Sequence, residues 1–92
     1  MTANEAKAII LQVLKDLELI DEETAELVAG GQKDVELSAL RIDSIAVVDL
    51  CVGLEEHVGR EVTIEELVEN STIGRLADHF AGTPVEALQA RG

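Results

Sequence analysis

Apolar residues in the first part of the chain recur with the spacing of an α-helix. Six of them can share one face of such a helix: Ala6, Ile9, Ile10, Val13, Leu14 and Leu17. Thr2 and Glu5 have the spacing of a capping box, in which each side chain binds the backbone N–H of the other residue. The pattern therefore predicts a helix that begins at Thr2 and ends between Leu17 and Leu19.

A long connection follows this helix. The acidic run Asp21–Glu23 can begin a short helix toward Val28, and Gly30-Gly31 interrupts it. We expect residues 32–42 to form an irregular segment, anchored to the core by Val35, Leu37 and Leu40. The whole connection has about two dozen residues, far more than the few that usually join elements of a compact domain. Connections of this length often carry function.

A second main helix is predicted from its N-cap, Asp43, through about Val58, with Gly59 as its stop. We expect Val47 and Val52 to face solvent or nearly so. The predicted buried side comprises Val48, Leu50, Cys51, Leu54 and Val58.

Two further helices complete the pattern. Thr63 and Glu66 have the spacing of another capping box, which predicts a short helix to about Glu69. Ser71 or Thr72 can cap a last helix that ends at Gly82-Thr83-Pro84. Its predicted inward face comprises Ile73, Leu76, Ala77 and Phe80.

These elements define an all-α fold class. The weak alternation of residues 60–64 has no partner strand, so no sheet is expected. We predict a four-helix bundle of three main helices and a short third helix, with a long first loop. The domain is placed at residues 1–82, and residues 83–92 are expected to form a flexible or frayed tail.

Composition restricts the partners of this domain. The chain has 92 residues, of which 47% are apolar, but it contains one Phe and no Trp or Tyr, and its net charge is −12. Single-stranded nucleic acid is usually bound by aromatic stacking over a basic groove, and anionic membranes also attract basic surfaces. We therefore expect neither nucleic-acid binding nor membrane insertion, and instead a monomer that docks on proteins with basic patches.

The cellular setting also follows from what the sequence lacks. Cys51 is the single cysteine, so no internal disulfide can form. No apolar run has the length of a membrane span, and the N-terminus lacks the basic and apolar regions of a signal peptide. A reducing cytoplasm is the expected location, and the initial Met1 with complete helix caps favours a free-standing chain.

The segment around Ser44 carries the candidate chemistry. Ser44 follows the predicted N-cap, so its hydroxyl lies in the first turn of a helix, after a long loop. Helix N-termini present unpaired N–H groups and a partial positive charge, which favour a phosphate. A phosphate ester on Ser44 can thus be stabilised without a basic side chain.

Asp43-Ser44-Ile45 resembles the Asp-Ser-Leu signature of acyl carrier proteins. The resemblance extends through helix-spaced residues to Val58-Gly59-Arg60-Glu61-Val62, which is similar to the family's short loop before its small third helix. Thr72-Ile73-Gly74-Arg75-Leu76 resembles the start of its last helix. The resemblance covers the chain from Ala6 to about Ala81.

The resemblance implies a carrier that is not an enzyme and has no catalytic or metal-binding residue of its own. A phosphopantetheinyl transferase moves a 4′-phosphopantetheine arm from coenzyme A to Ser44, and the arm holds a substrate as a thioester. Asp43 then serves recognition by the transferase. Acyl-loading and acyl-processing enzymes are expected to dock on four residues: Ile45, Asp49, Glu55 and Glu56.

Several positions depart from the family pattern. Arg41 stands where the family usually has Gly, Ile45 replaces Leu, Ala46 replaces a frequent acid, and His57 interrupts an acidic run. These changes predict a more apolar docking face and favour a specialised pathway. The cargo stays open among fatty acyl, polyketide and aminoacyl groups. A slot for an acyl chain is expected between the second and third helices. Five residues are expected to form its walls: Leu50, Cys51, Leu54, Ile64 and Leu67.

Other interpretations of the same residues stay open at this level. Ser44 can be an ordinary helix-start serine of an acidic interaction module that never carries an arm. A small hydrolase is a weaker alternative, in which Ser44 uses His57 or His79 as its base. Cys51 lies among apolar residues and is interpreted as inert. The acidic run at 21–23 lacks the spacing of a calcium-binding loop and is interpreted as a solvated helix start.

Overall fold

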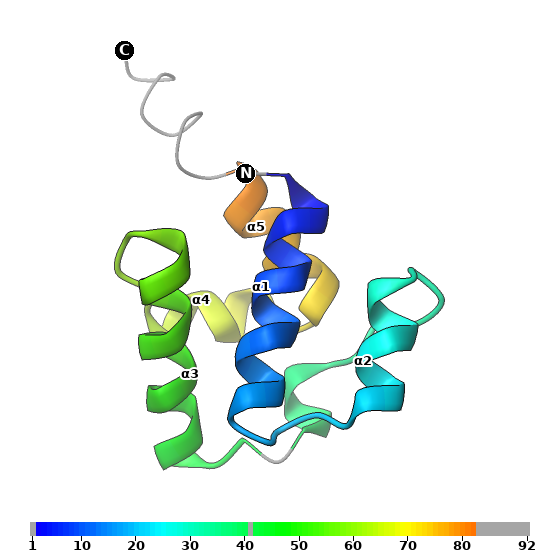
Figure 1. Cartoon of the computed structure of the whole chain (residues 1–92). Helices are drawn as coiled ribbons and strands as arrows, with labels where there is room; N and C mark the ends of the chain where they lie inside the picture. The colour runs from blue at the N-terminus through cyan, green and yellow to red at the C-terminus, as the bar shows by residue number, and fades with distance from the viewer. Residues whose placement is uncertain (1, 41, 83–92) are drawn as a thin grey trace.

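The computed structural model describes residues 2–40 and 42–82, and in them every regular element is helical (Figure 1). The prediction of an all-α fold is therefore confirmed. Strand-like pairing in this part of the chain is limited to one isolated bridge between Glu36 and Thr72. The elements in chain order are α1 (Ala3–Asp16), α2 (Glu22–Ala29), the 3₁₀-helix η1 (Leu37–Ala39), α3 (Ser44–Val58), α4 (Ile64–Glu69) and α5 (Ile73–Gly82).

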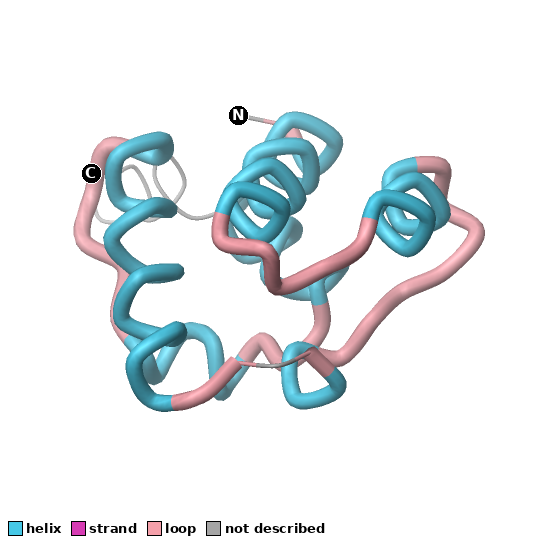
Figure 2. The backbone as a smooth tube through the Cα atoms, turned by 60° about the horizontal axis from the view of Figure 1, so that its bottom comes forward, coloured by secondary structure: helices cyan, strands magenta, loops and turns pink. Residues whose placement is uncertain are grey.

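Helix α1 is the centre of the arrangement. Figures 1 and 2 show α3 on one side of α1 and α2 on the other, and α1 also packs against α5. Helix α4 crosses between α3 and α5. The buried residues are all hydrophobic. The largest fully buried side chains come from α1, α2, α3 and α5: Ile10, Leu14, Val28, Leu50, Leu54, Ile73 and Leu76.

Both ends of α1 are closed by local hydrogen bonds. The predicted capping box is present, because Thr2 N donates to Glu5 Oε1 at 2.8 Å and Glu5 N donates to Thr2 Oγ1 at 3.1 Å. At the other end, Glu18 N donates to Lys15 O and the following amide donates to Leu14 O. This is the Schellman pattern, which places Glu18 in the left-handed region with φ 60°.

The long first connection is held against the start of α5. Leu37 N donates to Ser71 O at 2.7 Å, and Ile73 N donates to Val35 O at 3.0 Å. Asp34 Oδ1 accepts a hydrogen bond from Gly74 N at 2.8 Å and so caps α5 from forty residues away. Val35 and Leu37 are buried anchors as predicted, whereas Leu40 is only partly buried.

Two predictions about helix faces need correction. The sequence pattern places Val48 inside α3, but Val48 is 50% exposed, while Val47 is partly buried against the core. The reason is that Val47 lies three residues before Leu50 and seven before Leu54, which places it on their face of the helix. In α1, Leu11 is buried outside the predicted stripe, because α1 contacts helices on more than one side.

Other sequence-based boundaries agree with the structure or fall outside its described part. Asp21 caps α2, Asp43 caps α3, and Gly59 ends α3 with φ 79°. The predicted end of the last helix falls partly beyond Gly82. The predicted tail, residues 83–92, lies outside the described residues, so the domain boundary stays a prediction.

Candidate functional site at the start of helix α3

Ser44 is the first residue of α3 and is exposed. The residue before it performs the capping: Asp43 Oδ1 accepts hydrogen bonds from Ile45 N at 3.1 Å and from Ala46 N at 2.7 Å. Among the described residues, the Ser44 hydroxyl has no hydrogen-bond partner. Ser44 is therefore not the capping residue of this helix, and its oxygen is free to react.

An apolar groove lies beside this serine. It has a volume of about 320 Å³, and two of its lining residues, Ile42 and Val47, flank Ser44 in the sequence. Three of the predicted walls are present, Leu50, Ile64 and Leu67. The other two, Cys51 and Leu54, do not line it, because they are buried on the core side of α3. The remaining lining residues are Leu37, Ser38, Val68 and Ser71.

The outer face of α3 combines apolar and acidic side chains. Ile45 is 73% exposed and Val52 is 48% exposed, and Asp49 and Glu56 are also exposed. Positions 45, 49, 52 and 56 share one face of a helix. We call this set, together with the neighbouring Val48, the α3 outer face. The predicted docking residues Ile45, Asp49 and Glu56 thus lie on one surface.

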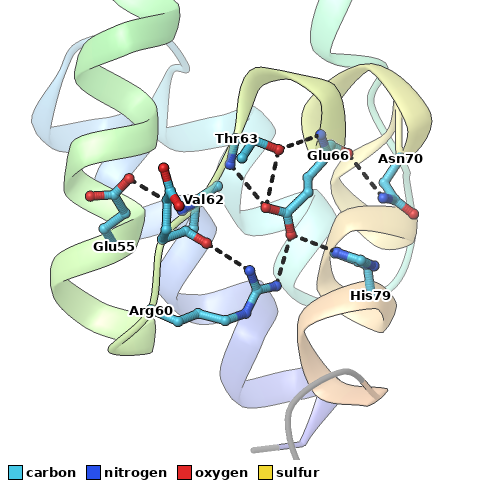
Figure 3. A network of polar contacts seen from close by, with 8 residues as sticks. Glu55, Arg60, Val62, Thr63, Glu66, Asn70 and His79 are labelled. Carbon is cyan, nitrogen blue, oxygen red and sulfur yellow. Dashed lines mark hydrogen bonds and ion pairs between the residues drawn. The ribbon is translucent and has the colours of Figure 1, made fainter. Parts of the chain in front are cut away.

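Glu55, the fourth predicted docking residue, is placed differently. Its carboxylate accepts a hydrogen bond from Val62 N at 3.2 Å, and its side chain is partly buried (Figure 3). Glu55 therefore faces the loop between α3 and α4. It helps to hold that loop in place.

His57 cannot form a catalytic triad with Ser44. His57 lies thirteen residues further along the same helix, which corresponds to about 20 Å, and its Nδ1 contacts Gly53 O at 2.9 Å. His79 Nε2 lies 2.8 Å from Glu66 Oε1. Cys51 is buried, and desolvation, followed by the charges of Glu55 and Glu66, raises the pKa of its thiol. Cys51 is therefore a core residue with little thiolate at neutral pH.

A polar cluster centred on Glu66 joins three elements (Figure 3). Glu66 Oε1 accepts a hydrogen bond from Arg60 Nη2 at 2.8 Å, and Oε2 accepts one from Thr63 N at 2.9 Å. Partial burial raises the pKa of Glu66, but hydrogen bonds from Arg60, Thr63 and His79 outweigh it and lower this pKa to about 2. Sequence spacing identified Thr63 and Glu66 as a capping box. It offered no signal for Arg60 or His79.

The described residues also bear on metals and membranes. Within residues 2–40 and 42–82, no cluster of three or more His, Cys, Asp or Glu side chains could hold a metal ion. Of the helices in these ranges, none has the length and apolar character needed to cross a membrane.

The fold and the site together define a class of protein. A small helical domain presents, at a helix start and near an apolar groove, an exposed serine whose hydroxyl has no partner among the described residues. His57 lies too far along the same helix to act as its base. This arrangement suits a protein that displays a covalently attached group, and the hydroxyl and groove fit a phosphopantetheine arm.

Comparison with known proteins identifies the family. The family model described as the phosphopantetheine attachment site matches residues 7–80, so the chain belongs to this family. The chain is also similar to Nonribosomal peptide synthetase 2 of Gibberella zeae, with 32% identity over 68 residues. This match covers 74% of the chain but only 1% of the fungal protein. No solved structure matches the chain significantly.

Family membership establishes the general role. The protein is a carrier to which 4′-phosphopantetheine is attached covalently. Domains of this family are not catalysts but carry substrates for partner enzymes, and a phosphopantetheinyl transferase modifies them. The resemblance seen in the sequence and the carrier role expected from it are thereby confirmed.

Proposed function

We propose that Ser44 is the residue that receives the phosphopantetheine arm. The observation that carries this proposal is the exposed Ser44 hydroxyl, which Asp43 leaves unpaired by capping α3 itself. The helix N-terminus favours the negative charge of a phosphodiester at this position. Ser38 and Ser71, the other two serines of the chain, instead line the groove.

Once attached, the arm supplies a thiol that holds acyl or aminoacyl groups as thioesters. The protein's own residues supply attachment, shelter and addressing. Ser44 anchors the arm, and Ile42 and Val47 lead from it into the groove, which can shelter an apolar group. Asp43 serves transferase recognition, since it lies immediately before the serine at the start of α3.

Partner enzymes dock on the α3 outer face in this proposal. Ile45, Val48 and Val52 provide apolar contact, while Asp49 and Glu56 meet a basic rim on the partner. Glu55 contributes less, because its carboxylate binds the loop between α3 and α4. The departures in sequence that predicted a more apolar docking face support this surface, although Arg41 lies outside the described residues.

The cargo follows less directly. The similarity to a peptide synthetase favours aminoacyl or peptidyl groups over fatty acyl or polyketide groups. We further propose that the protein acts as a monomer, because its charge of −12 opposes association with further copies. The cytoplasm is its proposed location.

The attachment site is tested by intact mass. The protein is incubated with coenzyme A and a broad-specificity transferase, and Ser44→Ala is compared with two control variants, Ser38→Ala and Ser71→Ala. We expect the mass gain of one arm in wild type and both controls and none in Ser44→Ala. A gain that persists in Ser44→Ala would refute the site.

The same experiment addresses the remaining alternatives. If several transferases leave the wild type unmodified, the acidic interaction module without an arm becomes the better account. Esterase activity of the unmodified chain that disappears in Ser44→Ala would favour a hydrolase. The position of His57 gives that function no support.

A further inference from the structure

Helix α4 is the least anchored wall of the groove. It has six residues, and only Leu67 is buried in the core. Its other two apolar residues, Ile64 and Val68, are 48% and 71% exposed. Isolated helices of this length are not stable in water, so α4 depends on contacts with the rest of the protein.

The other walls are held more firmly. On one side, Leu37 and Ser71 are joined by a 2.7 Å backbone hydrogen bond, which ties the long loop to the start of α5. On another side, Leu50 is fully buried in the core with the inner face of α3. The width of the groove therefore depends mainly on the position of α4.

The Glu66 cluster holds α4 through contacts outside the groove. Through Glu66 the helix is bound to Arg60 in the preceding loop and to His79 in α5, each at 2.8 Å (Figure 3). Arg60 is held in turn, because its guanidinium lies over the Phe80 ring, 5.4 Å from the centroid, and donates to Glu61 O at 2.7 Å. The contacts of Glu66 are charge-assisted and partly shielded from water, which strengthens them.

We propose that Glu66 is a positioning residue that sets the width of the groove by fixing α4 between Arg60 and His79. Glu66 thereby determines how well an apolar group on the arm is sheltered, although it touches neither the arm nor the group. The sheltering part of this inference rests on the proposed attachment at Ser44. The positioning of α4 stands independently of the arm.

The first test uses the unmodified full chain. Backbone amide hydrogen exchange is measured by NMR for wild type, Glu66→Gln and His79→Gln, with Asp21→Ala as a control that removes the cap of α2 on the far side of α1. Glu66→Gln keeps the side-chain size but removes the charge. In Glu66→Gln we expect the exchange of the Leu67 and Val68 amides, relative to that of Leu50, to become about tenfold faster. The reason is that a hydrogen bond to a charged group contributes a free energy equivalent to a tenfold or larger factor.

The second test measures sheltering. Wild type and variants are loaded with octanoyl or acetyl arms from the corresponding acyl-coenzyme A, and cleavage of the thioester by hydroxylamine is followed. Glu66→Gln should raise the octanoyl rate relative to the acetyl rate several-fold, because only the longer chain reaches the groove. Asp21→Ala should leave this ratio unchanged, which separates positioning from a general loss of stability.

Each outcome decides one part of the proposal. Unchanged relative exchange of the α4 amides in Glu66→Gln would overturn the positioning role. Faster exchange with an unchanged octanoyl-to-acetyl ratio would show that Glu66 stabilises α4 without controlling shelter, and would overturn that part. If neither the wild type nor any variant gains an arm, both the proposed function and the sheltering role fail. The exchange data still decide whether Glu66 positions α4.

Discussion

Helices α1 and α3 approach each other closely at Gly53. We expect Gly53→Ala to lower stability in the wild-type background and to raise it in a Val13→Ala background. A Cβ atom at position 53 would lie 2.7 Å from Val13 Cγ1, closer than real Cβ contacts. Val13 is buried, and a β-branched side chain in a helix is largely restricted to one χ1 rotamer, so it cannot easily turn away. Gly53→Ala must therefore push the helices apart or strain Val13.

Two opposing effects set the magnitude. Overpacking a well-packed core typically costs about 1–3 kcal/mol, whereas replacing Gly by Ala inside a helix stabilises by about 1 kcal/mol. We expect Gly53→Ala to lower the free energy of unfolding by about 1 kcal/mol in the wild-type background. In a Val13→Ala background the clash is absent, so the same substitution should raise it by up to about 1 kcal/mol.

Urea unfolding followed by far-ultraviolet circular dichroism measures both values, because the chain has no Trp or Tyr for fluorescence. Gly82→Ala is the control, since no described atom lies within 4 Å of the added methyl group, and it should change stability by less than about 0.5 kcal/mol. A stabilising Gly53→Ala in both backgrounds would refute the reasoning. It would mean that α1 and α3 do not need a glycine at their contact.

Three further predictions concern stability. Glu18→Gly should raise the free energy of unfolding by about 1 kcal/mol, because glycine tolerates a positive φ, whereas Glu18→Ala should not. Equal changes in stability for the two variants in urea titrations would contradict this explanation. Asp34→Ala should lower stability by about 1 kcal/mol through loss of the cap on Gly74 N, with Asp34→Asn retaining most of it, and an unchanged melting temperature would count against the cap. The pKa of Glu66 is lowered from 4.5 to about 2 in the folded state, so its stabilisation is complete above the unfolded value and is lost as pH falls toward about 2. Glu66→Gln should therefore flatten the acid limb of the stability profile, and an acid limb identical to wild type would exclude this role.

Much of the helical architecture could be predicted because its signals are local. The capping boxes at Thr2 and Thr63 and the caps Asp21 and Asp43 join residues only a few positions apart. Such contacts form within a single turn, so the order of residues is enough to place them. The Asp-Ser-Ile segment likewise indicates a carrier family through its residue types and its position at a helix start.

The sequence predicted less accurately which face of each helix is buried. Val47 and Val48 are adjacent and equally apolar, yet only Val47 packs against the core. Which of them is buried depends on the direction from which the neighbouring helices approach α3. The prediction that Cys51 and Leu54 line the groove is wrong for the same reason, because both lie on the core side of the helix.

Residue type and short spacing were enough to predict the helices, most of their ends, the acidic charge and the candidate serine. The packed fold alone shows that the Ser44 hydroxyl has no partner among the described residues, that a groove lies near it, and that Glu55 faces a loop. It also brings Asp34 to Gly74 and joins Arg60, Glu66 and His79. These residues are separated by up to forty positions, so their contacts exist only after apolar burial has fixed how the helices lie against one another.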